Sequence, residues 1–435
     1  MSATSKLDRV VVINDDGAER GGAAAIAIAS LRLLHARGVQ VTFLYGDSAY
    51  LGELPEGIRT SILGGRYLLE GARPFAAMRG LFDPQTAARL ARWIDMNDTP
   101  GTVYHLHNWH KILSPSVFKP LRRVADRLVL TAHDYFLACP NGGYFLYPQQ
   151  TVCEIVPGTP RCLVTACDRR NYGHKLWRVL RHTVRQWLID LNSAGAVIVA
   201  VHEKMTPLLA RGGIDRNRIV TLRNPVTRLR AERVQAERNK DVLFIGRVER
   251  DKGVDLLARA ARRAGARLRI IGDGSLAPMI ADRHPEVELL GWQCKQRIGE
   301  LVESARLFVM PTRWRETFGL APIEALMSGI PVIISRSTLI SDEVVEHGFG
   351  LACDPQDEEG LAATIRELID DNVRVADMSR RAFAGARQLA PTPAEWCEQL
   401  LALYESRAVG GTRSTASMPL MEPQGTATGF VGAAR

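Results

Sequence analysis

The sequence predicts an α/β protein built from two open, mainly parallel sheets, and three observations support this prediction. The chain has 435 residues and 46% hydrophobic content, too long for one core of ordinary size, so two domains of roughly 200 residues each are expected. Apolar, β-branched runs alternate with helical segments, an order that gives parallel strands covered on both faces. The same order restarts near residue 241.

The first half opens with a strand at residues 10–13, a glycine turn and an alanine-rich helix that ends near Ala36. Similar apolar runs predict further strands at residues 39–45, 102–107, 128–132 and 196–200. Helical segments separate several of them. A parallel sheet follows from this order, and in such sheets ligands sit beyond the carboxyl ends of the strands.

The second half repeats the pattern, with expected strands at residues 241–245, 268–271, 307–310 and 331–334 and helices at 254–265 and 321–327. The charged run 227–240 separates the halves as a linker. We therefore expect domains at 1–226 and 227–392, followed by a helix at 393–407 that packs back on the body. The tail 408–435 is rich in Gly, Ser, Thr and Pro and is expected to be disordered.

Glu316 and Glu324 flank a turn that follows one expected strand and opens a helix. Gly319 lies in this turn, so free backbone N–H groups and the positive end of a helix would face an anion such as a diphosphate. The carboxylates can accept hydrogen bonds from diols, Glu316 from a sugar and Glu324 from a ribose. A pair of glutamates at this spacing is by itself more often two solvated charges, so the interpretation depends on the surroundings.

A second turn leaves the strand 241–245 and carries Gly246, Arg247, Lys252 and Gly253. Cations fixed there can neutralise a leaving diphosphate. Each one alone is more often an exposed surface charge. Both turns stand at strand ends of the same half, which favours one shared anion site.

With these motifs, the second half resembles the nucleotide-sugar domain of GT-B fold glycosyltransferases. The specific resemblance is to the retaining glycosyltransferase family 4 (group 1) of the exopolysaccharide and lipopolysaccharide type. It extends over most of the chain and is most specific in the runs 246–253 and 316–324. It implies two Rossmann-like domains facing each other across a deep cleft. The domain 1–226 would bind the acceptor, and the domain 227–392 would bind the donor.

The resemblance also implies roles for individual residues. Arg247 and Lys252 would hold the diphosphate, Glu316 would contact the donor sugar, and Glu324 would bind the ribose. Further donor-binding positions implied in this way are Gly21, Gly22, Gly246, Gly274, Thr317, Phe318, Gly319 and Leu320. The loop at Gly291 and Trp292 would lie near the base.

His133 follows a strand of the first half, as the sugar-contacting histidine of the family does, and is the fourth catalytic candidate beside Arg247, Lys252 and Glu316. Three further histidines, His105, His107 and His110, surround the end of the strand 102–107. A structural role is the favoured interpretation for each of these three. They could also line the acceptor pocket.

The reaction implied is attack by an acceptor hydroxyl on the anomeric carbon as the nucleoside diphosphate leaves. The sequence contains no Asp-x-Asp, so we expect neither a divalent metal nor another cofactor, and positive charge would come from Arg247 and Lys252. Retention of configuration comes from the resemblance alone. In that family a donor phosphate oxygen is thought to deprotonate the acceptor.

Four of the seven cysteines fall within one 29-residue stretch: Cys139, Cys153, Cys162 and Cys167. Four thiolates can close a tetrahedral zinc site, although this spacing is not a pair of compact Cys-x2-Cys knuckles. Buried free thiols are the alternative, and a cytosolic setting argues against stable disulfides.

The basic excess is local, because residues 101–225 hold 17 Lys/Arg against 7 Asp/Glu. Within this region, residues 174–187 mix Lys and Arg with Trp, Leu and Val at helical spacing. Such a helix suits an anionic membrane surface. An ordinary amphipathic helix packed on the sheet is the alternative. No recognition motif for nucleic acid accompanies the basic residues.

The favoured hypothesis is a glycosyltransferase that extends a lipid-linked oligosaccharide in bacterial surface polysaccharide assembly. We expect it to be cytoplasmic and to contact the inner face of the cell membrane, because no sequence stretch suggests secretion or membrane spanning. One alternative is a transferase or synthase with a soluble acceptor. A second is a non-catalytic nucleotide-sugar-binding protein.

Overall fold

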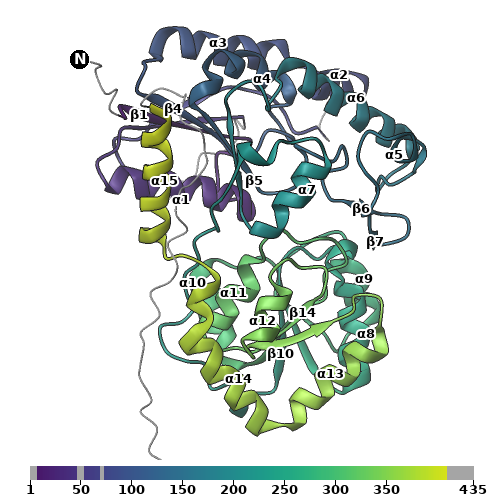
Figure 1. Ribbon diagram of the computed structural model, residues 1–435. Coiled ribbons are helices and arrows are strands. Elements are labelled where there is room, and N and C mark those ends of the chain that lie inside the picture. Colours follow the sequence, from purple (N-terminus) through teal and green to yellow (C-terminus); the bar gives the residue numbers. More distant parts are fainter. Residues whose placement is uncertain (1–6, 47–52, 69–72, 409–435) are drawn as a thin grey trace, which may run out of the picture.

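The computed structural model describes residues 7–46, 53–68 and 73–408. Within them, the first half forms a seven-stranded parallel sheet in the order β3-β2-β1-β4-β5-β8-β9 (Figure 1). Its strands are β1 (Arg9–Asn14), β2 (Val41–Tyr45), β3 (Arg59–Ile62), β4 (Thr102–Leu106), β5 (Leu128–Ala132), β8 (Val197–Ala200) and β9 (Ile219–Thr221). Its helices include α1 (Gly22–Ala36), α2 (Arg73–Leu81), α3 (Pro84–Asn97), α4 (Phe118–Leu121), α6 (Tyr172–Leu188) and α7 (Thr206–Arg211).

The second half forms a six-stranded parallel sheet in the order β12-β11-β10-β13-β14-β15 in the same described part of the chain. Its strands are β10 (Asp241–Ile245), β11 (Arg267–Ile271), β12 (Glu288–Leu289), β13 (Ala305–Met310), β14 (Val332–Ser335) and β15 (Gly350–Cys353). Its helices are α8 (Val254–Ala264), α9 (Ala277–Arg283), α10 (Lys295–Leu301), α11 (Leu320–Met327), α12 (Ser341–Glu346), α13 (Glu358–Asp370) and α14 (Asn372–Gly385).

The two-sheet α/β architecture predicted from the alternating pattern is therefore confirmed. The central strands are buried along their length, as the near-continuous apolar runs require. Four strands of the two large sheets were not predicted: β3, β9, β12 and β15. They lie at or next to the sheet edges and are short, and β3 carries the polar sequence Arg-Thr-Ser-Ile, so none has the apolar signature of a central strand.

The predicted linker 227–240 is not a free connection, because much of it packs on the second half. The Leu229 N–H donates to Ser328 Oγ and the Val234 N–H to the Ser328 carbonyl, both at 2.9 Å. The Val234 side chain is buried. The chain crosses between the halves twice, and the Val226 N–H donates to the Pro391 carbonyl where the crossings run side by side.

The last helix, α15 (Pro393–Ala408), returns to the first half (Figure 1). Trp396, Leu400 and Tyr404 are buried in the same core as α1 and β2. The tail expected to be disordered lies outside the described residues, except for Ala408, which ends α15. No helix in the described residues is long and apolar enough to cross a membrane.

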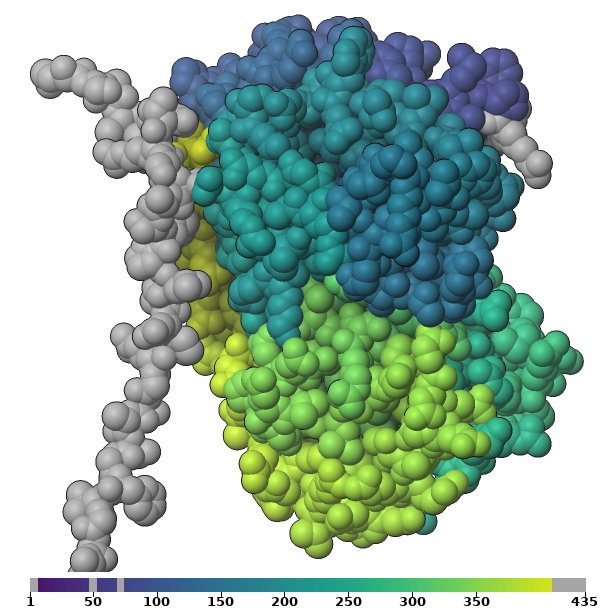
Figure 2. Space-filling model, turned by 45° about the vertical axis from the view of Figure 1, so that its right-hand side comes forward, coloured from purple at the N-terminus to yellow at the C-terminus, as the bar shows by residue number. Residues whose placement is uncertain are grey.

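An inserted segment between β5 and α6 holds the short hairpin β6 (Phe145–Leu146) and β7 (Thr151–Val152) and the helix α5 (Pro160–Val164). It also meets the second half, as the space-filling view shows (Figure 2). Gln356 Nε2 donates to the Gln150 carbonyl at 2.7 Å, and Arg169 pairs with Glu249 at 2.6 Å.

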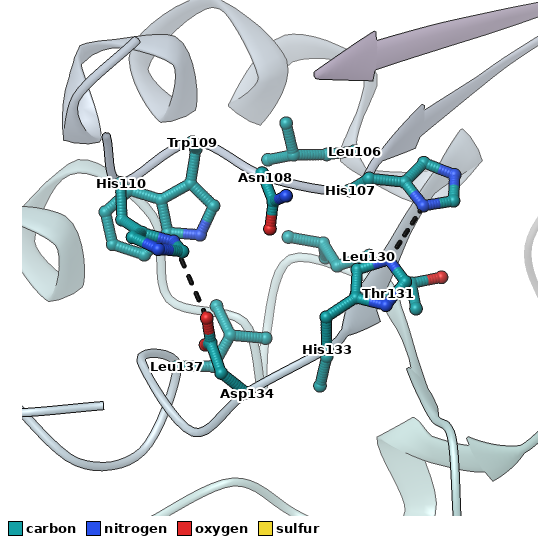
Figure 3. A pocket seen from close by; sticks show the side chains of 11 residues that line it. Leu106, His107, Asn108, Trp109, His110, Leu130, Thr131, His133, Asp134 and Leu137 are labelled. Carbon is teal, nitrogen blue, oxygen red and sulfur yellow. Dashed lines mark hydrogen bonds and ion pairs between the residues drawn. The ribbon is translucent and has the colours of Figure 1, made fainter. Parts of the chain in front are cut away.

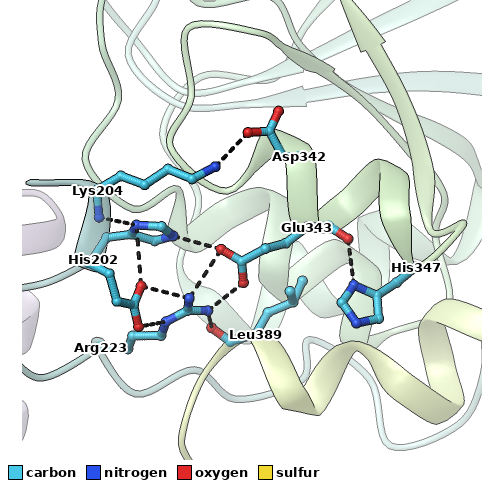
Figure 4. A network of polar contacts seen from close by, with 8 residues as sticks. His202, Lys204, Arg223, Asp342, Glu343, His347 and Leu389 are labelled. Carbon is cyan, nitrogen blue, oxygen red and sulfur yellow. Dashed lines mark hydrogen bonds and ion pairs between the residues drawn. The ribbon is translucent and has the colours of Figure 1, made fainter.

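A charged network joins the two halves near the places where the chain crosses between them (Figure 4). The Arg223 guanidinium binds the carboxylates of Glu203 and Glu343 at 2.7–3.1 Å. Buried His202 places Nε2 at 2.9 Å from Glu343. Although His202, Glu203 and Glu343 are close enough together for a metal ion, the Arg223 guanidinium already hydrogen-bonds both carboxylates. The network is therefore an ionic contact between the β8–β9 end of the first half and α12 of the second.

Replacing Glu343 by Gln should destabilise the protein by about 1–3 kcal/mol at pH 7, because Arg223 and His202 lose the charge they share. Burial raises the pKa of Glu343, but the hydrogen bonds from His202 and Arg223 lower it to about 2. This stabilisation is therefore present above the unfolded-state pKa of roughly 4.3 and is lost as the pH falls toward 2. Urea denaturation at pH 7 measures the change.

The matched control is Asp342→Asn on the same helix. Asp342 pairs with Lys204 at 2.6 Å, but its side chain is 70% exposed, so its removal should change stability by less than about 0.5 kcal/mol. Equal effects of the two substitutions would contradict a special role for the Glu343 network.

Candidate functional site

A pocket lies in the first half at the carboxyl ends of β4 and β5 (Figure 3). The loop after β4 supplies Asn108 and His110, and the loop after β5 supplies His133 and Asp134. Adjacent parallel strands place these loops side by side, because their carboxyl ends meet at one sheet edge. The loop after β4 is fixed by buried Asp15, whose carboxylate accepts the backbone N–H groups of residues 111–113 at 2.8–3.0 Å.

His133, the predicted sugar-contacting residue, is half-buried in this pocket. Its Nε2 lies 2.9 Å from Nδ1 of His107. Burial lowers the pKa of His133 to about 3. Burial, reinforced by the neighbouring rings of His105 and His133, also puts the pKa of His107 well below its usual value. Both imidazoles are therefore neutral near pH 7.

The other two histidines have different surroundings. His105 is buried, with Nδ1 at 2.6 Å from the Tyr404 hydroxyl and Nε2 at 2.7 Å from Thr131 Oγ1. Both ring nitrogens of His105 are thus used in structural hydrogen bonds, which link β4 to α15 and to β5. His110 lines the pocket, with Nδ1 3.7 Å from the Asp134 carboxylate.

Asp134 is a titratable group that the sequence motif did not single out. Burial raises the pKa of its carboxyl to about 6, although the Phe136 N–H bond and the charge of Lys111 act in the opposite direction. The carboxylate accepts the Phe136 N–H at 2.9 Å. Its remaining oxygen faces His110 in the pocket, which leaves it able to accept a ligand hydroxyl.

The second half brings Lys252 and Glu316 into direct contact as an ion pair. The Trp314 indole supports both, because Nε1 donates to Glu316 at 2.9 Å and the Lys252 ammonium lies 4.9 Å from the ring centroid. Burial alone would raise the pKa of Glu316, but Lys252 and Trp314 outweigh it, so this pKa is lowered. Glu316 is therefore held ionised beside a fixed cation.

Arg247 is the more exposed of the two predicted diphosphate contacts. Its side chain is 60% exposed and meets Asp251 at 3.4 Å. Lys252 is fixed by its turn, because Gly253 has φ +72° and a Cβ there would lie 2.1 Å from the Pro311 carbonyl oxygen. Only glycine fits this turn, which delivers Lys252 directly before α8.

The residues between Glu316 and α11 join the two halves. Thr317 Oγ1 donates to the His133 carbonyl at 2.9 Å, and the buried Phe318 ring anchors the turn in the core. Gly319 has φ +86° and directly precedes α11, which no side chain caps. A Cβ on Gly22 would lie 3.2 Å from Leu320, so the uncapped amino ends of α1 and α11 meet here.

The other predicted donor contacts have partners of their own. Glu324 pairs with Lys295 at 3.2 Å, and burial raises the pKa of its carboxyl while Lys295 lowers it. Gly274 packs against the loop after β10, because a Cβ there would lie 2.5 Å from the Val248 carbonyl oxygen. Gly246 lies at the base of that loop, and its N–H donates to the Ile271 carbonyl. Gly21 has φ +95° and open space around it.

The four clustered cysteines are free thiols in the inserted segment. Buried Lys175 lies beside them and donates to Cys162 Sγ at 3.4 Å. No three of their sulfur atoms lie within 4.8 Å of one another in the described residues. The thiols therefore share one region without forming the compact ligand set that zinc requires.

Sequence patterns did not single out several residues of these clusters: Trp314, Lys295, His107 as a partner of His133, and Asp134 as a titratable pocket residue. Trp314 lies two positions before Glu316, which is the one sequence clue to its role. The partnership of His107 with His133 depends on the pairing of β4 with β5. The sequence had suggested at most that His107 could line the acceptor pocket.

The described structure has the GT-B fold, shared with glycosyltransferases of known structure. Sucrose-phosphate synthase from Thermosynechococcus elongatus superposes with a TM-score of 0.70, covering 92% of this chain and 98% of that chain at 18% identity.

Residues 226–385, which form most of the second half, match the family model of Glycosyl transferases group 1. Glycogen synthase of Mycobacterium tuberculosis (strain ATCC 25618 / H37Rv) is 29% identical over 231 residues, 49% of this chain and 54% of that protein. The GDP-mannose-dependent alpha-mannosyltransferase of Corynebacterium glutamicum is 34% identical over 166 residues, 38% of this chain and 39% of that protein. The chain thus spans about half the length, or less, of these curated relatives.

Asp134→Asn should stabilise the protein increasingly as the pH rises. A buried carboxyl with a raised folded-state pKa is more stable protonated than ionised. The free energy of unfolding of the wild type therefore falls as the pH rises from the unfolded-state pKa near 4 to the folded-state value of about 6. The difference between variant and wild type should be small at pH 4 and reach about 2 kcal/mol at pH 8. Thermal unfolding across this pH range measures it.

Asp95→Asn serves as the control, because Asp95 is a surface carboxylate of the same half with a 52% exposed side chain. Its effect should stay small at both ends of the range. A flat pH dependence for Asp134→Asn would show that its carboxyl titrates normally.

Proposed function

We propose that this protein is a retaining glycosyltransferase of family 4 that transfers a sugar from a nucleotide diphosphate donor to an acceptor hydroxyl. The observation that carries the proposal is the meeting of two uncapped helix ends, α1 from one half and α11 from the other, at Gly22 and Leu320. Two positive helix ends at one point suit a diphosphate. The adjoining turn carries Glu316 and its partner Lys252.

In the proposed reaction the bond from the anomeric carbon to the diphosphate breaks, and a bond from that carbon to the acceptor oxygen forms on the same face. The acceptor proton passes to a donor phosphate oxygen. Lys252 and Arg247 neutralise the charge that grows on the leaving group. Glu316, kept ionised by Lys252 and Trp314, accepts a hydrogen bond from the sugar, and Glu324 accepts one from the ribose.

We propose that this charge compensation needs no divalent metal and no other cofactor. Lys252, Arg247 and the helix ends of α1 and α11 supply positive potential where a metal clamp would otherwise act. Turnover should therefore persist in a chelator.

The donor base and sugar can be found by a thermal-shift screen of UDP-, GDP- and ADP-sugars. A donor that binds the folded state raises the unfolding temperature in proportion to its occupancy. The similarity to a GDP-mannose-dependent enzyme makes GDP-mannose the first compound to test.

Lys252→Ala should lower the turnover of the donor found in this way by about 10²–10³-fold, because a fixed cation is lost at the leaving group. The control is Lys240→Ala, an exposed lysine of the same half, which should change turnover little. Donor hydrolysis and transfer are measured by release of the nucleoside diphosphate. Unchanged turnover in Lys252→Ala would contradict its role, and a wild type that binds donors without turnover would favour the non-catalytic alternative.

We further propose a lipid-linked oligosaccharide acceptor in surface polysaccharide synthesis, reached from the cytoplasmic face of the membrane. The supporting observation is the orientation of α6, whose buried residues are mainly cationic: Lys175, Arg181, Arg185 and Leu188. Its apolar residues are outside, with Leu176, Leu180 and Trp187 exposed. Phe75 and Met78 of neighbouring α2 are also exposed. An exposed apolar face in a region with excess positive charge suits an anionic membrane.

Leu180→Ser combined with Trp187→Ser should weaken binding to vesicles of anionic phospholipid at least tenfold, since each side chain contributes about 1.5–3 kcal/mol when buried. Val373→Ser is the control, because Val373 is 81% exposed on α14 of the other half. Vesicle sedimentation measures the partition. Wild-type protein that stays in the supernatant would favour the alternative of a soluble acceptor.

A further inference from the structure

In the contact between His107 and His133, the surroundings of the two rings determine which ring donates the hydrogen bond. His107 is buried and comes directly after β4, and its ring is inclined by 20° to that of His133, with centroids 5.2 Å apart. One ring nitrogen of each residue takes part in the 2.9 Å contact. Since both rings are neutral, one of them donates and the other accepts.

The second nitrogen of His107 decides which ring donates. His107 Nε2 is buried and has no hydrogen-bond partner in the described residues. A proton on Nε2 would leave a buried N–H donor without an acceptor, which is more costly than an unused lone pair. The proton therefore belongs on Nδ1 of His107, which then donates to Nε2 of His133.

This assignment fixes the state of His133 as well. Its Nε2 must offer a lone pair, so its single proton lies on Nδ1. This Nδ1 makes no hydrogen bond within the described part of the chain, and the ring is half-buried in the pocket. Thr317 holds the backbone of the same residue from the second half. His133 is thus held by its ring and by its carbonyl.

We infer that His107 is a positioning residue that holds His133 as a neutral Nδ1–H donor, aimed at a hydroxyl of the transferred sugar. This inference rests on the proposed function for the identity of the acceptor atom. Its structural part, the tautomer of His133, stands independently. A donor N–H can stabilise a sugar oxygen without placing a full charge in the site.

The tautomer is measured by ¹⁵N NMR of the imidazole nitrogens in wild-type protein and in two variants. Wild-type His133 should show a protonated Nδ1 and an unprotonated Nε2. His107→Asn places an amide N–H near the position of the original Nδ1 and should preserve this pattern. His107→Leu removes the donor, so His133 should become a mixture of tautomers.

Kinetics with the donor found by thermal shift give the second measurement. We expect His107→Leu to lower kcat at least tenfold with little change in donor KM, and His107→Asn to restore most of the loss. A wild-type His133 protonated on Nε2, or a tautomer unaffected by His107→Leu, would overturn the inference. Should His107→Leu fail to fold, the wild-type spectrum and His107→Asn still decide it.

The two proposals fail in different ways. If no nucleotide sugar is turned over but His133 carries its proton on Nδ1, the proposed function is wrong and the structural part of the inference holds. If turnover occurs but the tautomer is reversed, the inference is wrong and the proposed function stands.

Discussion

The hydrogen bond from Thr317 Oγ1 to the His133 carbonyl joins the two halves at the point where both carry their polar clusters. Thr317 directly follows Glu316, and His133 directly follows β5. Two independent sheets can form one site only if such a contact fixes the distance between their carboxyl edges. Further contacts across the halves, among them Gln150 to Gln356 and Arg223 to Glu343, support this one.

The two sides of the site, one from each half, differ in charge. The first half contributes neutral imidazoles, because burial lowers the pKa of His107 and His133. The second half contributes the fixed charges of Lys252 and Glu316. A site divided in this way can balance an anionic ligand on one side while offering neutral hydrogen-bond groups on the other. The division follows from position, since the imidazoles are packed against a sheet core, whereas Lys252 has both a carboxylate and an indole as partners.

The sequence allowed a correct prediction of the fold because the central strands are continuous apolar runs that only a doubly covered parallel sheet explains. Edge strands such as β3 lack this signature, since half-exposed strands need no apolar run. The charged composition of residues 227–240 gave no sign of their backbone hydrogen bonds to Ser328, which hold this run on the second half. Local composition does not report contacts made with residues 100 positions away.

The candidate site could be predicted only in part, for the same reason. Turns at strand ends pointed to Lys252 and Glu316 one by one, and their ion pair across 64 positions appears only in three dimensions. The pairing of His107 with His133 likewise depends on the register of β4 and β5. Roles that depend on one residue can be anticipated from a motif, whereas roles that depend on a partner require the fold.

For helix α6, the periodicity of the sequence predicts the helix but not its orientation. The spacing correctly indicates two different faces but does not say which one is buried. Arg181 and Arg185 face inward because they donate to the carbonyls of Gly80 and Leu137 at 2.7 and 2.8 Å. Once these cations satisfy buried carbonyl groups, Leu180 and Trp187 on the opposite face must point outward. The exposed apolar surface is therefore a consequence of the buried arginines, and the acceptor proposal depends on what that surface contacts.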